Sequence, residues 1–182
     1  GRHVAFGDGI FKSENGGKSW KNMGLRKSEH ISEIIVHPNN SNIIWAASQG
    51  PLWSPGGQRG LYKSIDGGEN WKKVLGGGKW TGVTDIHMDP RNPDRIYAAT
   101  WQRHRTVAAL MGGGPESGLH RSEDGGETWT ELKSGLPNYA GKIGFTLSPQ
   151  KPDVIYASIE LEKRNGAVYK SEDRGSSWKK MS

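Results

Sequence analysis

The chain lacks cysteine altogether, and none of its apolar runs approaches the roughly eighteen residues needed to cross a membrane. The absence of cysteine excludes disulfide bonds, thiolate zinc sites and cysteine nucleophiles, but leaves the compartment open. Hydrophobic residues are also scarce, at 32% of 182 positions. Eight tryptophans nevertheless argue against disorder. The chain is therefore expected to be globular and to have no membrane span.

Glycine is abundant instead, with 27 residues beside 9 prolines, but it does not follow the triplet period of collagen. This composition favours many short strands joined by tight turns, and no segment predicts a substantial helix. The net charge is +6, which permits acidic partners without demanding them. The chain begins without an initiator methionine or a signal-peptide pattern, so it is expected to be part of something longer.

Two motifs repeat along the chain. Four segments align without gaps and end in tryptophan, at residues 10–20, 61–71, 119–129 and 168–178. Between them lie three copies of a second motif, in which a β-branched run, a short turn and a second apolar run follow one another, at residues 35–47, 86–99 and 145–157. Because both motifs share one spacing of about fifty residues, they form a single structural unit that is repeated.

Each unit contains four short β-branched or aromatic runs, which predicts a four-stranded antiparallel meander. In the first complete unit the strands are expected at about residues 31–36, 43–47, 61–64 and 71–75. Such units, repeated radially, make a β-propeller. The predicted fold is an all-β propeller segment of about three and a half blades, with a half blade at 1–28 and blades at 29–78, 79–137 and 138–182. Because propellers usually close with more blades, the missing ones are expected from the same propeller or from a second copy.

The turn before the last strand of each unit reads Ser-x-Asp-x-Gly-x-(Ser/Thr/Asn)-Trp, with asparagine replacing aspartate in the first copy. A carboxylate or amide here can accept hydrogen bonds from backbone N–H groups a few residues on, and the glycine can adopt angles that a Cβ forbids. The tryptophan can cover the turn with its apolar face. These positions are therefore predicted to be structural: Asn15, Trp20, Asp66, Trp71, Asp124, Trp129, Asp173 and Trp178.

The four turns resemble the Asp-box of sialidase-like (BNR) repeats, and the resemblance covers nearly the whole chain. It implies a propeller of the group that includes sialidases, xyloglucan-cleaving glucanases, sortilin-type receptors and photosystem assembly factors. The string at residues 88–103 is most similar to large bacterial proteins with a sortilin-like N-terminal propeller. Those proteins are typically exported and often labelled glycosyl hydrolases. The resemblance therefore implies a secreted or cell-envelope location, while the label alone establishes no chemistry.

The loops of a meander divide between two faces. The repeated turns share one face with short Pro-containing turns, whereas the loops on the other face do not repeat, and variable loops on a repetitive scaffold usually carry the function. Aromatic residues there offer stacking platforms for sugars or peptide side chains, and the basic run at 103–105 offers a clamp for a carboxylate or phosphate. Alternatively, the aromatic residues pack their own loops and the basic run is solvated or paired. The candidate ligand-binding residues are His30, Trp53, Trp80, Trp101, Arg103, His104, Arg105 and Tyr139.

The sequence also offers two candidate catalytic acids. A glycosidase needs two carboxylates about 5–10 Å apart across the scissile bond. Asp85, in the predicted innermost strand, is the first candidate, and Glu29 of the neighbouring unit is the second. A solvated channel aspartate is the alternative. The Arg-Ile-Pro signature expected of sialidases is absent, but a xyloglucanase whose second acid lies outside the chain stays open.

Other ligands are not expected. The histidines lack metal-ligand spacing, no cofactor is predicted, and the glycine run at 112–114 is expected to give flexibility rather than a phosphate site. Lysine pairs beside the repeated tryptophans are predicted to prevent the edge strands from pairing with other chains, so nucleic-acid binding is not expected. Two hypotheses remain. The first is a non-catalytic exported propeller module that binds protein, peptide or glycan through the loop face and central channel. The alternative is part of a glycoside hydrolase, xyloglucanase-like rather than sialidase.

Overall fold

The computed structural model describes residues 6–182, and their regular structure is β except for one short 3-10 helix, η1 (Glu162–Arg164). The all-β prediction is confirmed. Three four-stranded antiparallel sheets, called here the first, second and third blades, contain most of the strands. The first blade consists of β3 (Ile31–His37), β4 (Asn40–Ser48), β5 (Gly60–Ser64) and β6 (Lys72–Leu75). The second blade consists of β7 (Thr81–Asp89), β8 (Asn92–Gln102), β11 (Gly118–Ser122) and β12 (Thr130–Leu132). The third blade consists of β13 (Ile143–Leu147), β14 (Ile155–Glu160), β15 (Gly166–Ser171) and β16 (Lys179–Lys180).

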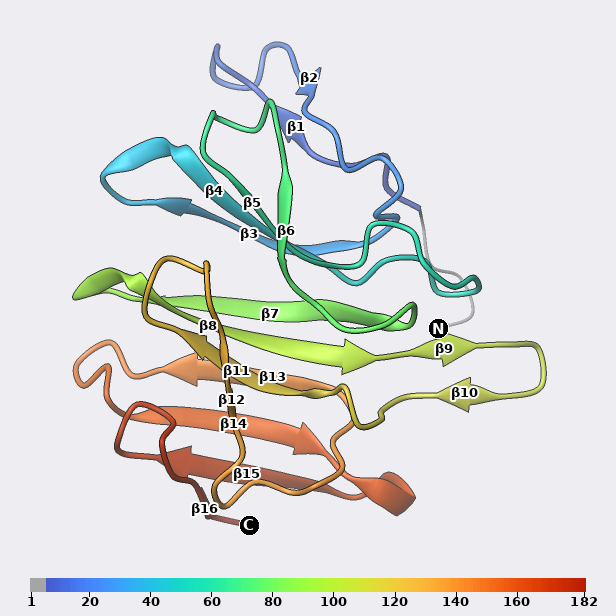
Figure 1. The fold of residues 1–182 in the computed structure, drawn as a ribbon, viewed down its shortest axis with the longest axis vertical. Coiled ribbons are helices and arrows are strands. Elements are labelled where there is room, and N and C mark those ends of the chain that lie inside the picture. Colours follow the sequence, from blue (N-terminus) through green and yellow to red (C-terminus); the bar gives the residue numbers. More distant parts are fainter. Residues whose placement is uncertain (1–5) are drawn as a thin grey trace.

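The blades stack one on another, as Figure 1 shows. Beyond the first blade lies a two-stranded half blade of β1 (Phe11–Lys12) and β2 (Lys21–Asn22). Each complete blade is a meander in chain order, and in the second blade an extra hairpin of β9 (His104–Arg105) and β10 (Leu110–Met111) is inserted after β8. The predicted strands of the first blade agree with the observed ones to within a few residues.

Apolar side chains on alternate strand positions fill the space between the blades. Trp45 of the first blade packs in one buried cluster with Ile86 of the second, and Tyr97 of the second blade packs in another with Phe145 of the third. Because successive side chains of a strand point to opposite faces, each middle sheet can contribute to both clusters. A single sheet has no neighbour to bury its apolar faces, so the hydrophobic core forms only where one blade packs on the next.

The repeated turns are closed by one hydrogen-bond pattern. In the first blade the Ser64 hydroxyl donates to Asp66 (2.8 Å) and accepts the Gly68 N–H (2.9 Å), while Asp66 accepts the Asn70 N–H (2.9 Å). Gly68 has a φ of +96°, which a side chain would disfavour. The turns at residues 13–19, 122–128 and 171–177 repeat the pattern, with Asn15 in place of aspartate in the first, so these side chains are occupied with the backbone of their own turns. Their structural role stays a prediction.

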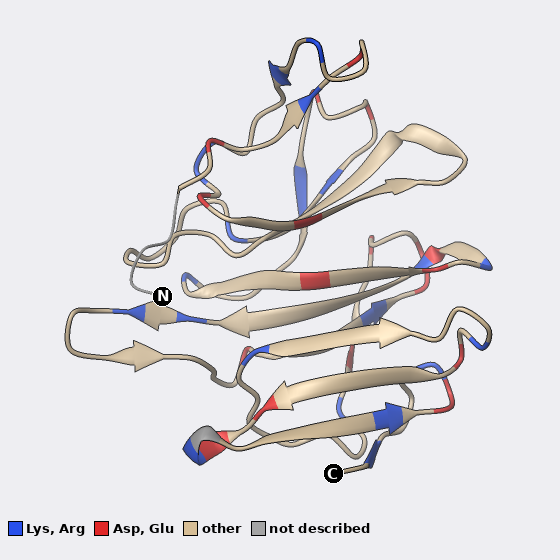
Figure 2. Cartoon of the chain, turned by 180° about the vertical axis from the view of Figure 1, so that it is seen from behind, with Lys and Arg blue, Asp and Glu red and all other residues tan. Residues whose placement is uncertain are grey.

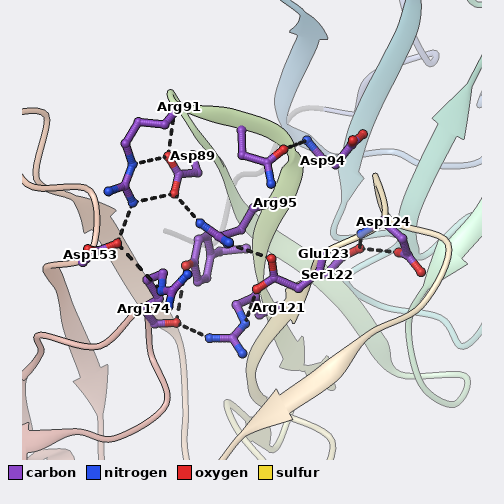
Figure 3. A network of polar contacts seen from close by, with 12 residues as sticks. Asp89, Arg91, Asp94, Arg95, Arg121, Ser122, Glu123, Asp124, Asp153 and Arg174 are labelled. Atoms are coloured by element: carbon purple, nitrogen blue, oxygen red, sulfur yellow. Dashed lines mark hydrogen bonds and ion pairs between the residues drawn. The ribbon is translucent and has the colours of Figure 1, made fainter.

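Ion pairs tie the second blade to the third beside these turns (Figure 3). The Asp89 carboxylate, whose side chain is 0% exposed, accepts N–H groups from Arg91 (2.9 Å) and Arg95 (3.0 Å). Arg91 also reaches Asp153 of the third blade (2.6 Å), and Arg95 contacts Glu123 (2.8 Å). Burial disfavours the charge on Asp89, but these hydrogen bonds outweigh it and lower its pKa to about 2. On the turn face, the two arginines and their acidic partners therefore form one connected network of ion pairs.

Candidate functional site

The non-repeating loops of the first and second blades are joined on the face opposite the turns. The N–H of Gly56 donates to the carbonyl of Lys79 (2.8 Å), and that of Arg103 donates to Trp80 (3.0 Å). The N–H of Arg105 donates in turn to the carbonyl of Leu52 (3.2 Å). Three loops that are distant in sequence thus form one continuous surface, called the loop face below.

Arg59 organises the loop between β4 and β5 from within. Its side chain is nearly buried, and its guanidinium donates to the carbonyls of Gln49 (2.6 Å), Ser54 (3.0 Å) and Pro51. Carbonyl oxygens satisfy the donors but do not neutralise the charge. Burial is the main reason why the pKa of Arg59 falls to about 10, and the neighbouring charge of Arg103 lowers it further. Sequence analysis did not single out Arg59, because nothing marks it apart from other basic residues.

Two of the predicted aromatic platforms carry a guanidinium. The Cζ atom of Arg105 lies 5.7 Å from the ring centroid of Trp53, and that of Arg103 lies 4.9 Å from Trp101. The Trp101 indole also donates to the carbonyl of Gly112 (2.8 Å), which fixes its orientation. Such stacked cations hold an indole in place while leaving its ring partly accessible. Trp53 is 44% exposed.

The third platform, Trp80, is stacked differently. The His104 ring lies with its centroid 3.8 Å from that of Trp80, and the Arg59 guanidinium lies 5.8 Å from the same indole. The structure therefore brings together all of the predicted residues of the basic run and three of the aromatic ones. Tyr139 belongs to a different part of the face, close to Gly113 of the next loop.

The segment at 102–117 differs from the flexible loop expected from its glycines. It forms the β9–β10 hairpin, which extends away from the blades in Figure 1 and has the fully exposed Val107 at its tip. The glycines permit close approach: a Cβ on Gly113 would lie 2.6 Å from the carbonyl of Ala140, and one on Gly114 would lie 2.1 Å from the Gln102 side chain. Close approach to the backbone at Ala140, rather than flexibility, accounts for Gly113, and contact with the Gln102 side chain accounts for Gly114.

A pocket of about 460 Å³ opens beside Arg103, between the start of β3 and the ends of β4 and β8. Its polar lining consists of Ser28, Glu29, His30, Gln49 and Arg103. One Arg103 N–H donates to Gln49 Oε1 (2.9 Å), and His30 Nδ1 lies 3.0 Å from the carbonyl of Gly50. The pocket thus contains two of the predicted binding residues, His30 and Arg103, and one predicted acid, Glu29, which is adjacent to His30 in the chain.

The predicted catalytic acid Asp85 lies on the innermost strand of its blade, but its partner is not Glu29. Its carboxylate contacts His87 Nε2 (3.2 Å), accepts the Phe145 N–H (3.0 Å) and shares a hydrogen bond with Glu33. Burial opposes the charge of Asp85, yet the hydrogen bonds from His87 and Phe145 lower its pKa. Burial raises the pKa of Glu33. When the two carboxyl groups share one proton, that proton is therefore favoured on Glu33, and Asp85 is the charged member of the pair.

Local backbone irregularities place these two acids. Glu33 and Asp85 stand at the same distance before the prolines that end their strands, and in both strands the pairing register shifts just before the acid. Such a bulge turns the following side chain, here toward the backbone of the next blade. Glu33 accepts the Ile86 N–H (3.0 Å), as Asp85 accepts that of Phe145. Glu33 was missed by sequence analysis, although comparing the two repeats position by position would have revealed it.

Residues 6–182 contain no group of three or more His, Asp or Glu side chains placed to hold a metal ion. Likewise, no helix within the same residues is long and apolar enough to cross a membrane.

Comparison with known proteins supports the fold. No model of a known protein family matches the chain. A probable oligoxyloglucan-reducing end-specific xyloglucanase of Neosartorya fischeri is 23% identical over 87% of this chain and 18% of its own length. An ancestral GH74 enzyme of known structure superposes on 98% of the chain with a TM-score of 0.74 at 21% identity, and the GH74 xyloglucanase of Xanthomonas campestris superposes on 96% with a TM-score of 0.71 at 16% identity.

The chain spans about a fifth of the length of that curated relative, and 22% and 27% of the two solved chains. At these identities the likeness shows the fold, which is a partial β-propeller, as predicted from the repeats. The proteins that the chain resembles are thus glycoside hydrolases by name.

Proposed function

We propose that this chain binds glycan on its loop face as part of a xyloglucanase-like propeller, and that its own residues hold carbohydrate rather than cleave it. The observation that carries the proposal is the set of Trp53, Trp80 and Trp101, each fixed by a stacked cation or imidazole on one face. The names of the similar proteins support a glycan as ligand. The resemblance to exported sortilin-like propellers extends the proposal to a secreted or cell-envelope protein.

Fixed indoles suit sugars for a physical reason. A pyranose has an apolar face of C–H groups that can lie on a flat aromatic ring, while its hydroxyls reach for polar groups at the ring edge. On the loop face the guanidiniums of Arg103 and Arg105 supply such donors beside Trp101 and Trp53. Because the indoles are already held in place, little side-chain entropy is lost when a ligand binds.

The acids of the chain argue against hydrolysis by these blades alone. Glu33 and Asp85 are hydrogen-bonded to each other, so no sugar bond fits between them. Glycosidases keep their two carboxyl groups about 5–10 Å apart. Both acids also accept backbone N–H groups of the adjacent blade, which is a structural role. The predicted partner Glu29 lies in the pocket instead.

Calorimetric titration with a xyloglucan heptasaccharide tests the binding role. We expect Trp53→Ala and Trp80→Ala to weaken affinity by about tenfold each, or about 1.4 kcal/mol, because each removes a stacking surface. Trp20→Ala is the control, since Trp20 is an exposed indole on the turn face, 62% exposed against 44% for Trp53. If both loop-face variants bind as the wild type does, or if all three lose the same affinity, the loop face is not the binding surface.

A second candidate function is supported by the xyloglucanase names: these blades supply one acid of a cleft whose other acid lies outside the chain. The release of reducing ends from xyloglucan by the protein separates the two. We expect Asp85→Asn to leave any turnover intact, because Asp85 faces Phe145 and Glu33 rather than open space. Turnover that is lost in this variant, with unchanged heptasaccharide affinity, would make Asp85 a catalyst and the second candidate correct.

A further inference from the structure

The arginines of this protein fall into two groups. Among the described side chains, those on the turn face and in the half blade contact a carboxylate: Arg26, Arg91, Arg95, Arg121 and Arg174. The three on the loop face, Arg59, Arg103 and Arg105, form no ion pair with any residue from 6 to 182. Figure 2 shows the same contrast, because the β9–β10 hairpin carries basic segments and no acidic one. Among the described side chains, the arginines without an ion pair are therefore concentrated where the predicted ligand site lies.

These guanidiniums also lie close enough to repel one another. Burial lowers the pKa of Arg103, and the charge of Arg105 lowers it further; Arg103 acts on Arg59 in the same way. Like charges held together by surrounding structure are costly unless an anion joins them. A bound carboxylate between them would remove that cost. The cluster is thus better matched to an anionic ligand than to a neutral one.

The pocket beside Arg103 shows where such a ligand fits. Gln49 and Trp101 fix the guanidinium, but the single contact to Gln49 leaves other N–H groups of the fork available. Two further polar atoms there have no partner among the described residues. One is the hydroxyl of Ser28, a residue that is 0% exposed, and the other is Nε2 of His30. Buried polar atoms without partners are rare in folded proteins, and they indicate a place that a polar ligand or water completes.

We propose that this pocket binds an acidic sugar, with the carboxylate of a uronic acid unit on Arg103 and the ring hydroxyls on Glu29, His30 and Ser28. The inference rests on the proposed glycan binding and names its substrate class. A guanidinium fork matches a carboxylate in a bidentate geometry. The volume of about 460 Å³ exceeds what a bare inorganic anion fills and falls within the range of small-ligand pockets. Glu29 repels a free anion but can accept hydrogen bonds from sugar hydroxyls, which favours a sugar acid.

Titration calorimetry with trigalacturonic acid and with its carboxyl-reduced neutral counterpart tests this inference. The two trisaccharides have the same rings and differ in the charged group alone. We expect the acidic form to bind at least tenfold more tightly, with an affinity that falls between 50 and 300 mM NaCl because the contact is ionic. Arg103→Gln should abolish this preference. Arg174→Gln is the control: it removes the same charge from an exposed site on the turn face and should leave the preference unchanged.

The outcomes separate the inference from the function on which it rests. Equal binding of the acidic and neutral trisaccharides overturns the acidic-sugar proposal, whereas xyloglucan binding that depends on Trp53 would still stand. An equal loss of affinity for the acidic trisaccharide in Arg103→Gln and Arg174→Gln also overturns it, because the overall positive charge of the protein, and not the pocket, would then attract the ligand. Competition by sodium acetate as strong as that of the trisaccharide shows that the pocket recognises a carboxylate without a sugar, and the proposal fails. Thermal unfolding of each variant checks that the fold is retained.

Discussion

The two faces of this propeller segment treat their charges in opposite ways. On the turn face, Asp89 draws Arg91 and Arg95 into a network that crosses to the third blade. On the loop face, Arg59 and Arg103 are satisfied by carbonyls, an amide and indole rings, and their charges stay uncompensated. The two faces of one scaffold therefore serve different purposes. The ion pairs of the turn face hold neighbouring blades together, whereas the loop face has charges available to bind a ligand.

The repetition of the sequence explains this division. Turn-face residues occur at fixed places in every unit, so that a contact between one blade and the next can recur. Lys21 meets Glu69 (2.8 Å) between the half blade and the first blade, and the equivalent Lys72 meets Glu127 (2.9 Å) one blade further on. The loops do not repeat, and their arginines form no ion pair among residues 6–182.

The largest expected effect comes from opening the turn-face network. Asp89→Asn keeps the shape of the side chain but removes the charge that Arg91 and Arg95 share, so Arg95 is left largely buried and without this partner. Breaking a buried pair in this way costs about 3 kcal/mol of unfolding free energy. Urea denaturation measures it, with Asp94→Asn, an exposed acid near the start of β8, as a near-neutral control. Sugar affinity should not change, and a large loss of affinity in Asp89→Asn would contradict the separation of the two faces.

An intermediate effect is expected from acid. The pKa of Asp89 is about 2 in the folded protein and near 4 in an unfolded chain. Its contribution to stability is therefore complete above pH 4 and is lost as the pH falls through about 2, by about 2 kcal/mol in total. Urea midpoints at pH 7, 4 and 2.5 measure this slope. Asp89→Asn should show a smaller loss over the same range, and identical slopes in the two proteins would show that other carboxylates dominate.

The smallest effect is expected on the loop face. Arg105→Gln removes a charge that has no acidic partner among residues 6–182, and the backbone hydrogen bond from Arg105 to Leu52 stays. The unfolding free energy should change by less than about 0.5 kcal/mol. A loss comparable with that of Asp89→Asn would mean that the loop face also holds the blades together.

The fold was largely predictable because its signals are local. The alternating runs and the turn motif around Asp66 and Asp124 each lie within about ten residues, and the hydrogen bonds that close the turns lie within the same stretch. The site was predictable only in part. Sequence placed Arg103 and Trp101 on one face, but it did not identify their stacking or the role of Arg59. Glu33 was missed, since its contact with Asp85 crosses from one repeat to the next.

The sequence by itself determined the repeating unit, its strands and turns, and the face on which the loops vary, because these depend on residue type and on neighbours along the chain. The tertiary structure alone decided which charges found partners. It brought Asp85 to the backbone of Phe145 and Arg91 to Asp153, and it gathered Arg59, Arg103 and Arg105 with no ion pair to an acid among residues 6–182. The contacts of Asp85 and Arg91 join residues 60 and 62 positions apart, and only the stacking of one blade on the next brings such residues within the few ångströms over which ion pairs and hydrogen bonds act.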